Sequence, residues 1–115
     1  SCTSREFFDS CLRALAPGGL LLVNTASMPR ALAGAEIATL AGALDGDTSR
    51  AFIVADPAAA RGRRRGNLVL VACQDPFTEG ELEEAERAVR RLPLPVRTWA
   101  LDDAALPCPE GVRVR

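Results

Sequence analysis

Three short apolar runs constrain the fold of this chain more than any other feature of its sequence. They occupy residues 20–23, 51–55 and 68–73, and runs of this length without polar alternation predict β-strands that are covered on both faces. The segment between the second and third runs, residues 56–66, holds a proline, two glycines and four arginines. It is too short and too broken for a crossover helix, so we expect the second and third strands to be antiparallel.

Helices are predicted between and after these strands. Thr3 or Ser4 can cap a first helix that ends near residue 16. Ser27 can cap a second helix that runs to about residue 44 and is apolar nearly all round. Thr78, with Glu81 three residues on, predicts a third helix with a buried stripe at Leu82, Ala85, Val89 and Leu92. A proline-rich tail at 93–115 follows and is expected to pack on the core through a strand-like stretch at 96–101.

Composition excludes several classes of function. The chain has 115 residues, enough for one domain, and its net charge of −1 offers no general attraction for nucleic acid or an anionic membrane. It contains no His, Lys or Tyr, which removes the usual general base and the commonest metal ligand. The four cysteines form no CxxC pair, so no metal site is expected. No apolar run approaches the length of a membrane span, and a cytoplasmic location is expected.

Two segments resemble a known family. The sequence FF at 7–8 followed by LAPGGLLLVN at 15–24 resembles the segment after the catalytic strand in class I S-adenosylmethionine-dependent transferases, and more narrowly the spermidine synthase (aminopropyltransferase) group. The sequence GNLVLVAC at 66–73 resembles the last, antiparallel strand of that family. The resemblance implies an α/β fold: a partial Rossmann-like methyltransferase sheet of three strands in spatial order first-third-second, with about three helices. Residues 1–115 would then form a single partial domain, the C-terminal half of the transferase domain.

The same resemblance implies a function for the intact parent protein and a limit for this chain. The parent would transfer an aminopropyl or methyl group to a small-molecule acceptor from S-adenosylmethionine or its decarboxylated form. The family's glycine-rich turn and its cofactor-binding and catalytic acids would all precede Ser1, and this chain contains no G-x-G sequence. We therefore expect this chain alone to bind no cofactor and to be inactive.

Four residues are candidates for the wall of a substrate pocket. Asn24, Thr25 and Ser27 follow the first apolar run, where open α/β sheets place ligands. The resemblance aligns Asn24 with a glutamine that faces the amine substrate, and Pro57 with a proline that lies against the polyamine. The alternative is that Asn24, Thr25 and Ser27 are turn and capping residues, which these types favour through local hydrogen bonds.

The arginine-rich loop leaves its own alternatives open. Arg61, Arg63, Arg64 and Arg65 stand where the spermidine synthase group places aromatic residues, and they would repel a polyamine dication. The loop is either solvated or in contact with an anion, while nucleic-acid binding is disfavoured because no aromatic residue is interleaved. The pair Asp102-Asp103 is expected to cap a helix start rather than to bind a cation.

A non-enzymatic role is the alternative from another class. In the implied strand order the first strand has an unpaired edge, which invites pairing with another chain. The partner would be the missing N-terminal half or a second copy in a homo-oligomer such as a dimer. The second case would make the chain an α/β self-association or interaction module.

Overall fold

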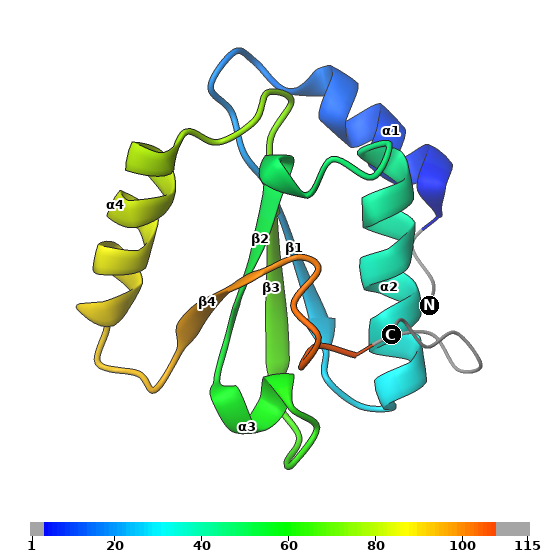
Figure 1. The fold of residues 1–115 in the computed structure, drawn as a ribbon. Coiled ribbons are helices and arrows are strands. Elements are labelled where there is room, and N and C mark those ends of the chain that lie inside the picture. The colour runs from blue at the N-terminus through cyan, green and yellow to red at the C-terminus, as the bar shows by residue number, and fades with distance from the viewer. Residues whose placement is uncertain (1–3, 108–115) are drawn as a thin grey trace.

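The computed structural model describes residues 4–107, which form one β-sheet with helices on both of its faces (Figure 1). The elements in chain order are α1 (Arg5–Ala14), β1 (Leu21–Ala26), α2 (Arg30–Ala43), β2 (Ala51–Ala55), α3 (Pro57–Ala60), β3 (Asn67–Ala72), α4 (Glu79–Arg90) and β4 (Arg97–Ala100), with a 3₁₀ turn at Thr48–Arg50 before β2. No helix within this part of the chain is long and apolar enough to cross a bilayer.

The sheet has the order β1-β3-β2-β4. Strand β3 is antiparallel to both of its neighbours, with Leu70 opposite Val23 of β1 and Ile53 of β2. The predicted order first-third-second with an antiparallel last strand is therefore confirmed. Strand β4 adds a fourth, antiparallel strand in which Trp99 stands opposite Ile53, so the strand predicted in the tail is also confirmed.

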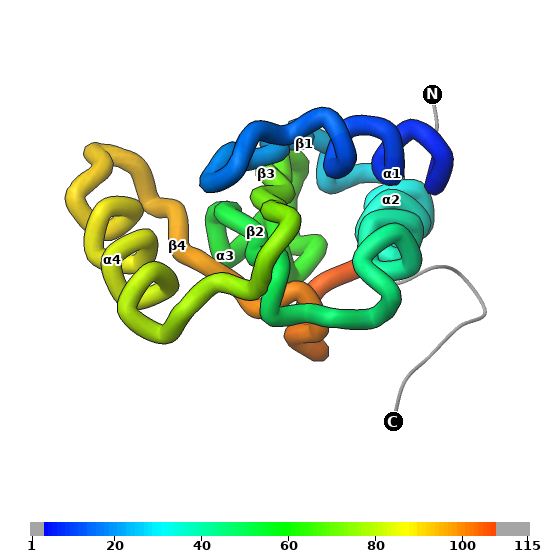
Figure 2. The backbone as a smooth tube through the Cα atoms, turned by 90° about the horizontal axis from the view of Figure 1, so that it is seen from above, coloured from blue at the N-terminus to red at the C-terminus, as the bar shows by residue number. Residues whose placement is uncertain are grey.

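The main core lies between the sheet and the two long N-terminal helices. Seen from above, α1 and α2 lie together on one side of the sheet and α4 lies on the other (Figure 2). Side chains of β2 and β3 that face α1 and α2 are fully buried, among them Ile53, Leu68 and Leu70. They pack with Phe8 of α1 and Leu40 of α2. Because β3 is antiparallel to its neighbours, the ends of β1 and β2 lie beside the start of β3 at one edge of the domain.

The opposite face of the sheet is only partly covered. Phe52 of β2 packs against Phe77 with a ring-centroid distance of 5.2 Å, but Leu22 of β1 remains 63% exposed. The prediction that the first strand is covered on both faces is therefore wrong, because α4 packs toward β4 and leaves β1 open. The stripe predicted for α4 is confirmed in position but not in depth: Leu82, Ala85 and Val89 are half-buried while the other α4 residues are exposed. Leu92 follows the helix and is 46% exposed.

Capping explains where most of the helices begin. The Ser4 hydroxyl accepts from the Phe7 amide of α1 at 3.1 Å. The predicted capping box of α4 is confirmed, since the Thr78 amide donates to Glu81 at 2.8 Å and the Glu81 amide donates to Thr78 at 3.1 Å. Ser27 does not cap α2, which instead starts after Pro29 without a side-chain hydrogen bond.

The segment at 56–66 forms no crossover helix, as predicted, whereas the helix predicted to start at Asp102-Asp103 is not found in residues 101–106. The segment at 56–66 contains the one-turn helix α3, which forms because Asp56 accepts from the Ala58 amide at 2.7 Å and Pro57 suits a first helical turn. Residues 101–106 form turns and no helix. Asp103 caps one of these turns by accepting from the Ala105 amide at 2.8 Å.

Candidate functional site

A cavity of about 450 Å³ opens where β2 ends and β3 begins. Its volume lies within the roughly 300–1,000 Å³ range of small-molecule sites. It occupies the sheet face that α1 and α2 leave free, at the end where open α/β sheets place ligands. Most of its wall is apolar, and a few polar groups lie at its rim. The lining side chains that matter here are Val54, Asp56, Arg64, Arg65, Asn67, Val69, Leu92, Leu94 and Val96.

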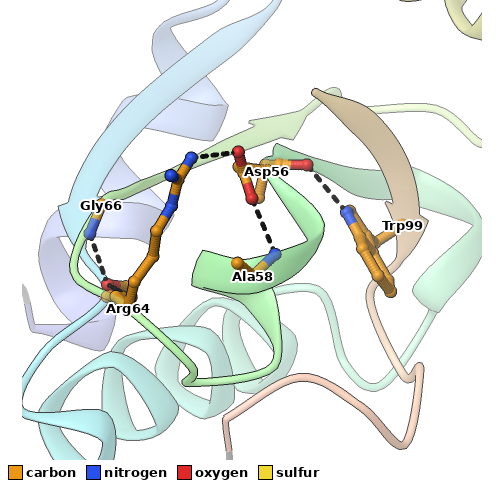
Figure 3. Close-up of polar contacts among 7 residues, drawn as sticks. Asp56, Ala58, Arg64, Gly66 and Trp99 are labelled. Carbon is orange, nitrogen blue, oxygen red and sulfur yellow. Dashed lines mark hydrogen bonds and ion pairs between the residues drawn. The ribbon is translucent and has the colours of Figure 1, made fainter. Parts of the chain in front are cut away.

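Asp56 organises the polar rim of this cavity. One of its carboxylate oxygens caps α3 at the Ala58 amide, and the other forms an ion pair with the Arg64 guanidinium (Figure 3). The Asp56 side chain is only 17% exposed, whereas that of Arg64 is 60% exposed. The ion pair therefore holds the arginine loop against the start of α3 and neutralises one of the two guanidiniums at the rim.

Ser27 joins the end of β1 to the start of β3. It is fully buried, and its hydroxyl accepts from the Gly66 amide at 2.8 Å. In return the Ser27 amide donates to the Gly66 carbonyl at 2.9 Å. Both polar groups of Ser27 are thus used within the fold, where they tie the end of β1 to the arginine loop, and Ser27 does not line the cavity.

The other predicted pocket residues lie in different places. Asn24 and Thr25 belong to β1 and do not follow it, because β3 supplies Val69 and Leu68 as their pairing partners. Side chains of directly opposed residues share one face of a sheet, so exposed Asn24 lies beside Val69 on the cavity face. Thr25 lies on the opposite face. Pro57 begins α3 directly after Asp56. Asn24 and Pro57 are thus next to residues that line the cavity, Val69 and Asp56, but none of the four predicted pocket residues lines the cavity itself.

One wall of the cavity was not predicted from the sequence. Leu92, Leu94 and Val96 come from the segment between α4 and β4 and close the cavity from the side. Two of these side chains are strongly exposed, Leu92 at 46% and Leu94 at 60%. The signal in the sequence was the alternation of leucine with proline at 92–95, which excludes a helix and yet places apolar side chains in an exposed segment.

The four loop arginines have different environments. Arg64 pairs with Asp56, and the Arg61 guanidinium lies 5.6 Å from the centre of the Trp99 ring. Within residues 4–107, Arg63 and Arg65 form no ion pair. Arg65 lines the cavity, whose rim therefore carries two guanidiniums and one carboxylate. This excess of positive charge disfavours the binding of a diamine.

The remaining reactive groups give no metal centre or nucleophile in the part of the chain that the structure describes. No three His, Cys, Asp or Glu side chains there converge on one point. Partial burial raises the pKa of the Cys73 thiol above its ordinary value, which disfavours the reactive thiolate. Cys2 and Cys108 lie outside the described residues.

Comparison with known proteins gives one informative match. No family model matches the sequence, and no curated protein matches it. Among solved structures, the chain is similar to a probable spermidine synthase from Corynebacterium glutamicum ATCC 13032, with a TM-score of 0.63 and 26% sequence identity. The match covers 100% of this chain and 45% of that protein. The chain therefore spans less than half the length of its structural neighbour, and its sheet fits a Rossmann-like fold.

Proposed function

We propose that this chain is the C-terminal portion of a spermidine synthase-like transferase, in which it completes the sheet and forms one wall of the acceptor pocket. The observation that supports this proposal is the full-length match to 45% of a probable spermidine synthase. The cavity at the end of β2 is the part of this chain that would face the acceptor.

The unfinished side of the sheet agrees with this role. In the described sheet β1 pairs only with β3, so its other edge carries unpaired backbone groups. On the uncovered face Leu22 is 63% exposed, and covering this side chain would contribute about 1–2 kcal/mol. We assign both surfaces to the N-terminal half, which would pair a strand with β1 and cover Leu22.

The cofactor contacts are assigned to the same upstream half. The sequence of this chain does not fit an S-adenosyl cofactor, because it contains no G-x-G turn to cradle the cofactor. In the intact cytoplasmic enzyme an aminopropyl or methyl group would be transferred to a small acceptor. This chain would position the acceptor and exclude water from it, and it would be inactive alone.

The upstream reading frame tests this proposal. We expect it to encode a strand followed by G-x-G, with an acidic residue about 20 positions further on. The longer product should bind S-adenosylmethionine or its decarboxylated form in calorimetric titration, and the 115-residue chain should not. Micromolar binding of either compound to the 115-residue chain would contradict the division of roles between the two halves.

The open edge of β1 also supports a second function, self-association without catalysis. Two copies would pair through β1 and bury Leu22, so the Leu22→Lys variant should be monomeric where the unmodified chain is a dimer. Leu32→Lys is the matched control, because Leu32 is 58% exposed but belongs to α2 and not to the strand. Sedimentation velocity measures the outcome. A monomer at high concentration of the unmodified chain would exclude this second function.

A further inference from the structure

We infer that a second cavity, formed by α3, α4 and β4, binds a small polyanion through a phosphate or pyrophosphate group. It lies at the β4 edge of the sheet, whereas the surface assigned to the N-terminal half lies at the β1 edge. Three guanidiniums reach this cavity, from Arg61 after α3, Arg90 in the last turn of α4 and Arg97 at the start of β4. The arginines are distant in sequence and are brought together by the fold.

Trp99 fixes the wall of this cavity. Its indole N–H donates to the Ala55 carbonyl of β2 at 3.1 Å (Figure 3), and the residue is only 8% exposed. The Arg61 guanidinium lies 5.6 Å from the centre of this ring, a distance at which a cation is attracted to the aromatic face. The backbone of Arg61 is held at the end of α3, whose first turn Asp56 caps. Arg61 is thus positioned before any ligand arrives.

Arg97 faces the same side of the sheet as Trp99. The two residues are separated by one position in β4, and alternate residues of a strand project from the same face. Arg90 belongs to α4, which lies on the opposite side of the sheet (Figure 2), so it borders the cavity across the β4 edge. A ligand at this edge would therefore meet Arg61 and Arg97 beside Trp99 and Arg90 from the face that α4 covers.

The cavity is lined by two carboxylates, Glu86 and Asp103, against three arginines, which leaves a net positive charge. Glu86 forms an ion pair with Arg90 at 3.6 Å, and Asp103 accepts from the Ala105 amide at 2.8 Å. In the described part of the chain neither Arg61 nor Arg97 has a carboxylate partner. Their N–H groups remain available, and a guanidinium donates two parallel hydrogen bonds to phosphate or carboxylate oxygens.

The size of the cavity restricts the ligand further. Its volume is about 230 Å³, below the roughly 300 Å³ at which sites for drug-sized molecules begin. A phosphate or pyrophosphate group fits this size and charge. A diamine is disfavoured, because three arginines against two carboxylates leave the lining with a net positive charge. This ligand class differs from the substrate that the name of the structural neighbour indicates.

Titration of the full 115-residue chain with inorganic pyrophosphate at constant ionic strength tests the site. Trp99 is the sole tryptophan of the sequence, so its fluorescence reports on Arg61 directly, and calorimetry gives an independent dissociation constant. We expect saturable binding that weakens about tenfold or more in Arg61→Gln and in Arg97→Gln, since each loses charge-assisted hydrogen bonds. Putrescine should give no saturable signal.

The matched controls are Arg63→Gln in the same loop and Arg91→Gln beside Arg90, because neither residue lines the cavity. Both should bind pyrophosphate as the unmodified chain does. If all four variants lost affinity for pyrophosphate equally, the attraction would be diffuse and the inference would be overturned. The inference would also be overturned if about 10 mM pyrophosphate, which is above the millimolar range of weak sites, did not saturate the chain. Titration with adenosine diphosphate shows whether the natural ligand is a nucleotide. Tighter binding than that of pyrophosphate would indicate a nucleotide, and equal or weaker binding would indicate a free phosphate compound. Failure of this test would leave the transferase proposal intact, because neither cofactor nor N-terminal half is involved.

Discussion

Replacing Ser27 by Ala separates a structural from a substrate-binding role for this residue. The hydroxyl group is fully buried and accepts from the Gly66 amide at 2.8 Å, where the arginine loop returns to β3. Its second contact, with the Arg64 carbonyl, is 3.5 Å long and adds little. The substitution therefore removes one good hydrogen bond and leaves the Gly66 amide without its acceptor.

The cost follows from that unpaired amide. A buried donor that loses its partner costs about 1–3 kcal/mol, more than the net value of a hydrogen bond between neutral groups. Because the Gly66 amide is only partly buried, we expect the lower part of this range, a loss of about 1–2 kcal/mol in the free energy of unfolding. For a domain of this size that loss lowers the melting temperature by roughly 4–8 °C.

Urea unfolding followed by far-ultraviolet circular dichroism measures the free energy, and amide hydrogen exchange at Gly66 locates the effect. The denaturant slope should stay unchanged, since the surface exposed on unfolding is the same. Ser10→Ala is the matched control, because Ser10 is exposed on α1 and alanine favours a helix by about 0.5 kcal/mol. This control should be neutral or slightly stabilised.

The reasoning would be refuted by a change below about 0.3 kcal/mol together with unaltered exchange at Gly66, since an unpaired donor costs more than that. Such a result would mean that the Gly66 amide does not depend on Ser27. Ser27 would then again be a candidate for ligand contact.

Three further predictions concern the loop, the 3₁₀ turn and the free thiol. Gly62 has φ +77°, and an added Cβ would lie 2.6 Å from the Arg30 guanidinium, which donates to the Ala60 and Ala105 carbonyls and is held in place by them. Gly62→Ala should therefore lower the free energy of unfolding by about 1–2 kcal/mol in urea titrations. An unchanged urea midpoint would contradict this prediction. The Ser49 hydroxyl bonded to Asp47 lowers the pKa of that carboxyl, so the stability that Asp47 contributes is present above the unfolded value of 3.8 and is lost as pH falls through the folded value. The difference in stability between Asp47→Asn and the unmodified chain should therefore begin to shrink below pH 3.8 and vanish only once the pH has fallen through the lower folded value. A difference that stays constant in acid titrations would be the contrary result. Burial raises the pKa of the Cys73 thiol, so its alkylation by iodoacetamide should accelerate only at a pH above that typical of a free cysteine. Peptide mass spectrometry measures this reaction. Rapid alkylation at neutral pH would contradict the raised pKa.

Strands could be predicted from the sequence where the local preference of the residues for extended backbone agrees with their pairing in the sheet. Residues 51–55 were predicted and found as β2, because this strand is paired on both sides and its apolar side chains meet β3 and β4. Strand β1 continues through Asn24 and Thr25, whose local preference favours a turn, because β3 offers them partners. Here the pairing of β1 with β3 outweighs the preference of Asn24 and Thr25 for a turn, and this outcome cannot be predicted from the local sequence.

The candidate site was less predictable than the fold. Its position at the end of β2 and the start of β3 follows from the topology, but none of the four residues predicted for its wall lines it. The apolar wall at 92–96 depends on how the segment after α4 crosses the sheet face, which no local pattern specifies. The separation of Arg61 and Arg64 into different environments depends in the same way on Trp99 and Asp56, which are distant from one another in sequence.

The strand order also determines when the sheet can form during synthesis. Strand β3 lies between β1 and β2, so β1 has no described sheet partner until residues 67–72 have left the ribosome. At that moment β2 and β3 can form a local pair, whereas joining β1 to β3 closes a loop of more than 40 residues and is slower. A nascent chain stalled before residue 67 should therefore expose both edges of β1, and a chaperone or an already folded upstream strand would act on it in that interval.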